Sequence, residues 1–423
     1  MEKTYICSNG VPLYTYRNDA LHSFHLSLFF KAGTLYEDAS ECGITHFFEH
    51  VAIRNVNKII GGDMYRELDR RGVEFNASTY SEMIQFYTGG ETDSLPFSAS
   101  LITKVLSPIS LSAGELAKER KRIKAEIRES DDRNSSAFLS GEIVHSGTSL
   151  SNSILGNLRS IDKINLKKLN QYREKISVRG NFFFYLTGNY REEDLACVIS
   201  EIEKLEACGG EMRDNIAPVS NYFFNRQENV IIKNSPDTSV RFTFDVDMEK
   251  CPMQRGDLIY DILFGGYASP FFIKMSEEEG LFYDITSSSE RYKNIGNLSL
   301  AYEVKEKELY SSLKMALEIF KDFKESVLSE IDLMKTPYVK NSSLLLDDAR
   351  ELAFTFAYDN HIMELGYKSV VDRAEAYEKI TGEEVMASAR EIFTPKNLTL
   401  FIKGKKKKID KAKIEEMISD ILE

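Results

Sequence analysis

Cysteine is scarce in this sequence. Only five cysteines occur in 423 residues, they are widely scattered, and no two of them form a Cys-x-x-Cys pair. An odd number of isolated cysteines excludes a disulfide framework and a zinc knuckle built from cysteines. We therefore expect the protein to fold in a reducing compartment.

Long apolar runs and a basic charge balance are also missing. No stretch reaches the roughly 20 apolar residues that a membrane helix needs, and residues 1–16 lack the apolar core of a signal peptide. The net charge is −12, whereas a general nucleic-acid-binding protein needs a clustered basic face. The sequence thus predicts a cytoplasmic protein that neither spans a membrane nor binds nucleic acid.

The composition is that of a folded chain, with 42% hydrophobic and 11% aromatic residues, and the length exceeds one ordinary core. Alternating or continuous apolar residues predict strands, and apolar residues at helical spacing predict helices. The predicted strands are 23–33, two strands or a bent hairpin within 72–90, and 179–189. The predicted helices are one after Gly43, 63–71 with Gly72 as its stop, 112–132, 162–177 and 192–207.

The second half of the sequence repeats the pattern of the first. Residues 208–226 lose all periodicity and are rich in turn-forming residues, which predicts a linker. Before the linker, a helix ending in ELDRRG precedes strand-like text; after it, a helix ending in KMSEEEG does the same, with Gly72 and Gly280 at equivalent places. We therefore predict two copies of one α/β unit of about 200 residues, namely residues 1–207 and 227–423.

The stretch THFFEH places two of the six histidines four residues apart. In a helix, residues i and i+4 lie on one face, so His46 and His50 would present both imidazoles to one point, with Glu49 beside them. This His-x-x-Glu-His order is a zinc-peptidase signature. The alternative is a pair of core histidines, and zinc would require a third protein ligand.

A candidate for the third ligand lies on the predicted helix 112–132. This helix begins with a capping box, and two glutamates, Glu119 and Glu126, share the stripe of its apolar residues Leu116, Ile123 and Ile127. A carboxylate on the buried side of a helix needs a partner, because an unpaired buried charge is costly. The partner is either a metal ion with its histidines or an arginine or lysine.

The residues of this motif resemble those of the pitrilysin or insulinase-like zinc peptidases, which include the mitochondrial processing peptidases. In that family a glutamate follows the second histidine by 76 residues, and here Glu126 stands 76 residues after His50. Glu119 matches a second glutamate of the family, seven residues earlier. Further stretches that match are 33–38, 43–53, 67–82 and 152–157.

The resemblance implies an α+β fold of two homologous α/β sandwich domains, mostly antiparallel sheets packed with helices, joined by the linker as half of a clamshell. It implies one Zn²⁺ per chain, bound by His46, His50 and Glu126 with one position left for water. Glu49 would be the general base. Glu119 would orient a ligand histidine or assist the proton transfer.

The resemblance also implies a substrate strand. Asn76, Ala77, Ser78 and Thr79 would lie on an exposed edge strand to which a substrate peptide adds; the alternative is an ordinary hairpin strand. Phe47 and Phe48 are expected to pack in the core. The four other histidines are expected to be structural or on the surface: His22, His25, His145 and His361.

The second half departs from the family at one important place. The family's arginine and tyrosine that contact substrate fall on Ser276 and Tyr283, so the catalytic tyrosine is kept and the arginine is lost. Three explanations stay open: Lys274 or Arg291 substitutes, the second domain serves only as the other wall of the chamber, or a partner chain supplies the arginine.

The resemblance therefore implies a zinc endopeptidase that cleaves peptides or unstructured segments. We expect it to be the metal-bearing subunit of a dimer, either of two like chains or of this chain with a homologue that supplies the arginine. The competing hypothesis is a non-catalytic scaffold or peptide-binding subunit of a processing complex.

Overall fold

The computed structural model describes residues 1–38, 40–130, 135–206, 229–265, 267–281, 285–325, 335 and 339–423, and these form two compact units. Unit 1 comprises Met1–Ser130, Asn152–Ile216 and Ser343–Arg373; unit 2 comprises Asp131–Ser151, Ala217–Ser342 and Ala374–Glu423. The predicted linker, 208–226, lies outside the described residues. Within the described helices, none is long and apolar enough to cross a lipid bilayer.

The two units are not the continuous halves that the sequence suggests. Segment 131–151 belongs to unit 2 and segment 343–373 to unit 1. The physical reason is packing. Helix α5 (Ser136–Val144) lies against strands β8 (Ser239–Asp247) and β11 (Leu398–Gly404), and helix α13 (Ala349–Ala357) lies against β3 (Ser23–Lys31) and β6 (Phe182–Gly188). Each sheet is thus packed by a helix from a remote part of the sequence.

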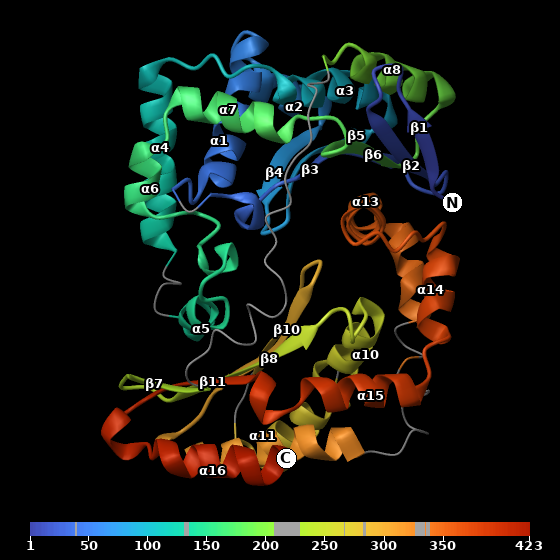
Figure 1. Ribbon diagram of the computed structural model, residues 1–423. Helices are drawn as coiled ribbons and strands as arrows, with labels where there is room; N and C mark the ends of the chain where they lie inside the picture. Colours follow the sequence, from blue (N-terminus) through green and yellow to red (C-terminus); the bar gives the residue numbers. More distant parts are fainter. Residues whose placement is uncertain are drawn as a thin grey trace. The chain divides into compact units, whose positions relative to one another are not determined.

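Unit 1 is built on a six-stranded mixed sheet with the order β1-β2-β6-β3-β5-β4 (Figure 1). Only the β2–β6 pair is parallel; the other pairs are antiparallel. The strands are β1 (Lys3–Ile6), β2 (Pro12–Arg17), β3 (Ser23–Lys31), β4 (Glu74–Thr79), β5 (Met83–Glu91) and β6 (Phe182–Gly188). Strand β6 is buried at every residue, as its continuous apolar sequence predicts.

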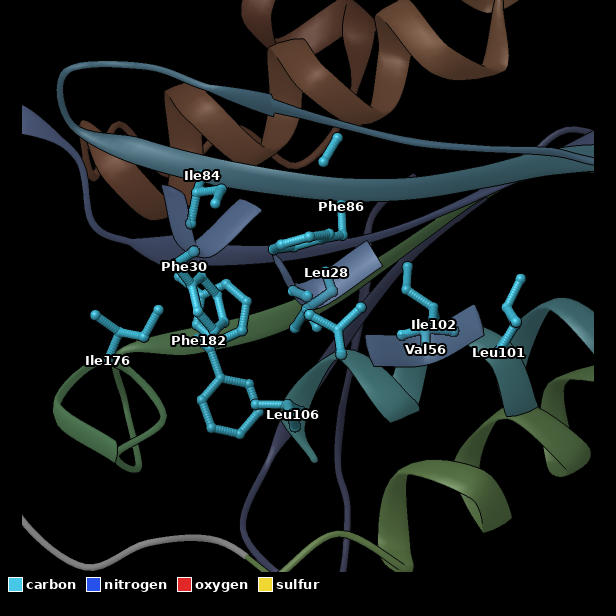
Figure 2. Close-up of a cluster of buried hydrophobic side chains, with 14 of the residues drawn as sticks. Leu28, Phe30, Val56, Ile84, Phe86, Leu101, Ile102, Leu106, Ile176 and Phe182 are labelled. Carbon is cyan, nitrogen blue, oxygen red and sulfur yellow. The ribbon is translucent and has the colours of Figure 1, made fainter. Parts of the chain in front are cut away.

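The apolar face of this sheet packs against helices. Alternate residues of β3, among them Leu28 and Phe30, meet Phe86 and Phe182 from neighbouring strands and Val56 from helix α1 in one buried cluster (Figure 2). Phe47 and Phe48 of α1 are fully buried in the same core, which confirms their predicted role. The helices of unit 1 are α1 (Ile44–Ile59), α2 (Met64–Arg71), α3 (Leu95–Thr103), α4 (Ala113–Glu129), α6 (Leu158–Lys163), α7 (Leu166–Ile176), α8 (Glu192–Glu203) and α13, followed by the π-helical turn η9 (Tyr358–Ile362).

One predicted helix is wrong in its bounds. Residues 162–177 do not form a single helix, because α6 ends at Lys163 and α7 begins after Asn165. The Asn165 side chain accepts a hydrogen bond from the Lys168 backbone N–H and so caps a new helix. The chain is extended at Ile164, which therefore separates the two helices.

The predicted hairpin at 72–90 is confirmed. Helix α2 ends at Gly72, whose φ of 61° is the left-handed conformation that favours glycine. Strand β4 then pairs antiparallel with β5, with Ala77 opposite Phe86. Because β4 is the last strand in the order, it is an edge strand of this sheet, as predicted.

Unit 2 repeats this architecture, which confirms the predicted duplication and the α+β class. Its sheet has the order β7-β11-β8-β10-β9, with β7–β11 parallel and the other pairs antiparallel. This is the pattern of β2-β6-β3-β5-β4 in unit 1. Gly280 has a φ of 59°, close to that of its predicted counterpart Gly72, and likewise precedes the edge strand. The strands are β7 (Val230–Asn234), β8 (Ser239–Asp247), β9 (Ile285–Arg291), β10 (Ile295–Glu303) and β11 (Leu398–Gly404).

A second core lies on one face of that sheet, centred on Phe242, Phe244 and Phe320. The helical segments that contribute to it are α10 (Met253–Phe264), the π-helical segment η6 (Phe272–Glu278), α11 (Leu309–Glu325), α15 (Gly382–Ile392), α16 (Lys411–Leu422) and α14 (Val370–Glu378), which includes residues of both units. Helix α5 packs against β8 and β11, but none of its described residues belongs to this core.

A buried histidine is expected to make unit 1 less stable in acid. His25 of β3 is 4% exposed, and burial, aided by the positive charge of Arg350, lowers its pKa from 6.5 to about 4. Below pH 6.5 His25 binds a proton in the unfolded chain but not in the folded chain. The free energy of unfolding therefore decreases as the pH is lowered, down to about pH 4. We expect His25 to cost about 2 kcal/mol of unfolding free energy between pH 7 and pH 5.

The measurement is urea unfolding at both pH values for the wild type, His25→Gln and His22→Gln. Glutamine keeps a polar partner for Ser27, whose Oγ lies 2.9 Å from His25 Nε2. His25→Gln should make the free energy of unfolding depend less on pH. His22 is exposed, and His22→Gln should leave that dependence unchanged. An undiminished acid loss in His25→Gln would contradict this assignment.

Candidate metal centre

Helix α1 carries both motif histidines, and a buried glutamate fixes its first turn. The two carboxylate oxygens of Glu37 accept hydrogen bonds from the backbone N–H groups of Gly43 (2.8 Å) and Thr45 (2.9 Å). A carboxylate at a helix N-terminus satisfies free N–H groups and complements the helix dipole. Gly43, at φ 86°, lies against Gly156, and a Cβ on Gly43 would come within 2.6 Å of the Gly156 Cα. The matching loop 152–157 therefore packs on the start of the metal helix.

His46 and His50 lie one turn apart on α1, with ring centroids 4.7 Å from each other. The His46 side chain is 7% exposed and that of His50 is 22% exposed. The spacing thus brings both imidazoles to the same face, as the sequence predicts.

Helix α4 supplies the facing carboxylates. Its N-terminus is a capping box: the Ser112 hydroxyl accepts from the Glu115 N–H, and the Glu115 carboxylate accepts from the Ser112 N–H. Glu119 is 2% exposed, whereas Glu126, two turns later, keeps 45% of its side chain exposed. The predicted stripe is therefore buried at Glu119 and opens towards solvent at Glu126.

His46, His50 and Glu126 converge on one point. The Nε2 atom of His46 is 3.6 Å from Glu126 Oε1, and the Nε2 atom of His50 is 3.5 Å from Glu126 Oε2. One ligand atom from each residue lies within 4.8 Å of the others, and no second group of this kind occurs among the described residues. Zinc bonds of about 2.0–2.2 Å in tetrahedral geometry put ligand atoms about 3.4 Å apart, so this donor set fits zinc.

The electrostatics of the cluster also favour a cation. Burial and the neighbouring His50 lower the pKa of His46 to about 3, so His46 is neutral and able to donate a lone pair. Burial alone would lower the pKa of His50, but hydrogen bonding to Glu119 and the charges of Glu49 and Glu126 outweigh it and raise that pKa. Three carboxylates around two imidazoles thus stabilise positive charge at this place.

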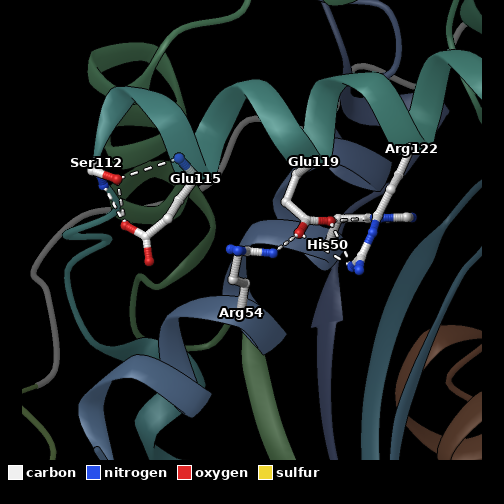
Figure 3. Close-up of polar contacts among 6 residues, drawn as sticks. All are labelled: His50, Arg54, Ser112, Glu115, Glu119 and Arg122. Carbon is white, nitrogen blue, oxygen red and sulfur yellow. Dashed lines mark hydrogen bonds and ion pairs between the residues drawn. The ribbon is translucent and has the colours of Figure 1, made fainter. Parts of the chain in front are cut away.

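Glu119 lies behind His50 and not among the converging ligands. Its Oε2 is 3.6 Å from His50 Nδ1, on the ring edge opposite Nε2. Its Oε1 accepts a hydrogen bond from Arg54 of α1, and Arg122 of α4 lies 3.3 Å from the same oxygen (Figure 3). Arg54 was not predicted from the sequence, although it follows His50 by four residues and so shares the helix face of the ligands.

Glu49, the predicted general base, is adjacent to the ligands but does not belong to their group. Its Oε2 accepts a hydrogen bond from the hydroxyl of Thr79 at the end of β4. Burial raises the pKa of Glu49, although the hydrogen bond from Thr79 and the charge of His50 oppose the rise. A carboxyl with a raised pKa is better suited to exchange protons near neutral pH.

The four predicted substrate-strand residues occupy different environments. Thr79 points to the α1 side and contacts Glu49, and Ala77 is buried on the same face. Asn76 is exposed and accepts from the Ala77 N–H, and Ser78 is half-buried. Alternation along a strand could have indicated the direction of Thr79, because Ala77 is apolar and packs in the core.

Unit 2 does not repeat this cluster in its described residues. Tyr283, the predicted catalytic tyrosine, lies outside the described residues. Of the two cations considered as replacements for the lost arginine at Ser276, Lys274 is 2.9 Å from Asp322, and Arg291 is 2.9 Å from the buried Asp257. Arg291 is therefore committed to an ion pair within its own unit.

Comparison with known proteins agrees with this geometry. Residues 14–157 match the family model described as Insulinase (Peptidase family M16). An "uncharacterized zinc protease" of Rickettsia bellii is 25% identical over 68% of this chain and 70% of its own. An "uncharacterized zinc protease" of Bacillus subtilis is 21% identical over 93% and 96%. The beta subunit of the mouse mitochondrial-processing peptidase is 27% identical over 37% of this chain and 32% of its own.

Solved structures share the fold at low sequence identity. A protease from Helicobacter pylori superposes with a TM-score of 0.82 at 16% identity, over 95% of this chain and 99% of the other. A structure described as a peptidase M16 inactive domain from Pseudomonas fluorescens has the same TM-score at 17% identity, over 95% and 98%. The predicted resemblance to the insulinase-like peptidases is confirmed, and the fold is shared with one structure described as a protease and with one described as an inactive domain.

Proposed function

We propose that this chain, which carries an M16 insulinase-type peptidase domain in residues 14–157, is a zinc-dependent endopeptidase acting on peptides or unstructured segments. The observation that carries the proposal is the convergence of His46, His50 and Glu126, with Glu49 next to it. A structural zinc site would be closed by four protein ligands. Among the described residues three converge, and Glu126 keeps 45% of its side chain exposed, which supports a site with room for water as the fourth ligand.

Zinc bound by these three side chains would polarise the peptide carbonyl and lower the pKa of a bound water towards neutrality. Glu49 then acts as the base: with Oε2 engaged by Thr79, Oε1 takes the proton of the attacking water. The same oxygen passes the proton to the leaving amine. Glu119 keeps the His50 ring oriented through Nδ1.

Strand β4 supports a substrate in extended form. It is the edge strand of its sheet, and its last residue contacts the general base. A peptide that adds to this edge would be held by backbone hydrogen bonds, which tolerate many side chains. Asn76, Ala77 and Ser78 would provide these backbone groups, next to Thr79.

The second candidate is a peptide-binding subunit without catalysis, and the loss of the family's arginine at Ser276 favours it. Arg291 is held by Asp257 and Lys274 by Asp322. A cation that stabilises the developing oxyanion contributes a few kcal/mol in the transition state. For the enzyme we therefore propose a dimer in which a homologous chain supplies the missing arginine.

One experiment separates these candidates. Zinc stoichiometry is measured on the purified chain, and a quenched-fluorescent peptide library is incubated with the chain alone and with any homologue encoded beside it. The endopeptidase requires one zinc per chain and cleavage under at least one condition. One zinc with no cleavage under either condition favours the peptide-binding subunit, and no zinc at all excludes the enzyme.

Thr79→Val is expected to lower kcat about tenfold or more without loss of zinc. The change removes the hydrogen bond that fixes Glu49 and keeps the shape of the side chain; a hydrogen bond to a charged group contributes about 1.5–3 kcal/mol. Thr79→Ser, which keeps the hydroxyl, is the matched control. Because the β4 backbone is unchanged, KM should stay near wild type. Equal kcat for Val and wild type would show that Thr79 does not position the base.

A further inference from the structure

Glu119 is the most enclosed carboxylate of the metal centre. Its side chain is 2% exposed and lies between His50, Arg54 and Arg122 (Figure 3). A charge so far from water needs partners that neutralise it. We call these four residues the Glu119 cluster.

Arg54 and His50 approach different oxygens of Glu119, and Arg122 lies within 3.4 Å of both. Arg54 donates from Nη1 to Oε1, and Oε2 faces His50 Nδ1 at 3.6 Å. The terminal torsion of a glutamate is broad, so nothing intrinsic to the side chain fixes which oxygen points where. By occupying Oε1, Arg54 leaves Oε2 directed at the imidazole. With Nδ1 directed at Glu119, the Nε2 atom of the same ring is directed at Glu126.

Arg54 and Arg122 differ in exposure and in the helix that carries them. The Arg54 side chain is 25% exposed and comes from α1, the helix of the histidines, four residues after His50. Arg122 is 67% exposed, belongs to α4 like Glu119, and lies at 3.3–3.4 Å. Exposed ion pairs within a helix contribute little, because solvent screens them and two long side chains must be ordered. Arg54 is thus the partner that fixes Glu119 relative to His50.

We propose that Arg54 is a positioning residue of the metal centre, which acts through Glu119 to hold the His50 ring in the orientation that binds the metal. This inference rests on the proposed function, because it takes zinc as the metal bound by His46, His50 and Glu126. It assigns to Arg54 no contact with substrate. Loss of such an outer partner typically weakens metal binding about 10–100-fold.

The test measures the zinc dissociation constant by competition with a chromophoric chelator. Arg54→Met, which keeps most of the apolar stem, should weaken zinc binding about 10–100-fold. Arg122→Met is the matched control and should change it less than about fivefold. Arg54→Lys, which keeps the charge without the planar fork, should recover part of the loss.

A double-mutant cycle with Glu119→Gln separates positioning from a merely structural role. If Arg54 acts through Glu119, adding Arg54→Met to Glu119→Gln causes no further loss of zinc affinity. Losses that multiply in the double variant would overturn the proposal. If Arg54→Met alone unfolds, the comparison of Glu119→Gln with the double variant still tests the proposal, because Glu119→Gln removes the buried charge that would be left unpaired. Thermal unfolding of each apoprotein monitors this.

The remaining outcomes are also decisive. A folded Arg54→Met with wild-type affinity overturns this inference and leaves the proposed function intact, since the wild type then binds zinc without help from Arg54. A wild type that binds no zinc overturns both. The two failures are therefore distinguished by the wild-type titration alone.

Discussion

Glu49→Gln is expected to lower kcat by roughly 10²–10⁴-fold, the usual contribution of a general acid–base group, and to leave one zinc per chain. Glutamine has the shape of glutamate, and its carbonyl oxygen still accepts the hydrogen bond from Thr79. It has no basic oxygen to take a proton. Glu49 is not among the converging ligands, so the metal should remain.

The measurement is peptide cleavage under single-turnover conditions, together with zinc analysis of the same sample. Glu129→Gln, an exposed change on α4, serves as the control and should keep wild-type rates. Glu49→Gln also tests for contaminating proteases, because their activity would persist in this preparation. A rate within a few-fold of wild type would remove Glu49 from the mechanism, and a loss of zinc would assign it to the ligands.

Glu126→Ala is expected to have the second large effect, abolishing both zinc retention and cleavage. The change removes one of three converging ligands, so zinc affinity should fall by more than the roughly 10–100-fold that loss of an outer partner costs. Glu126 is 45% exposed, so its truncation leaves no buried cavity, and the fold should persist. Truncating either histidine would confuse metal loss with packing, because both are more buried.

The check is dialysis against a weak chelator followed by metal analysis, with circular dichroism to confirm folding. Glu129→Ala, one turn further along α4, is the matched control and should retain zinc. If Glu126→Ala kept stoichiometric zinc after dialysis, the third ligand would lie elsewhere in the chain. In that case the convergence of His46, His50 and Glu126 would no longer support the assignment as a zinc hydrolase.

Much of the centre could be predicted from the sequence because it depends on local helical spacing. His46 and His50 share a face of α1 since four residues make about one turn, and Glu119 and Glu126 share a stripe of α4 for the same reason. The capping box at Ser112 fixed where that second helix begins. The repeated strand pattern in the sequence predicted the duplication, and the two sheets have the corresponding strand order.

Other features could not be predicted, because they depend on how elements meet. The same stripe of α4 contains a carboxylate that is 2% exposed and one that is 45% exposed, a difference that only the crossing of α1 and α4 decides. The hydrogen bond from Thr79 to Glu49 joins residues 30 apart in sequence, and that from Arg54 to Glu119 joins residues 65 apart. The break at Asn165 depends on a cap that competes with a continuous helix.

By itself, then, the sequence determined which side chains each helix presents together, since backbone periodicity is a property of the local chain. Only the tertiary structure decided which oxygen of Glu119 faces His50, which cation holds it there, and which remote helix packs on each sheet. These choices follow from burial and hydrogen bonding between segments far apart in sequence, and no local pattern encodes them.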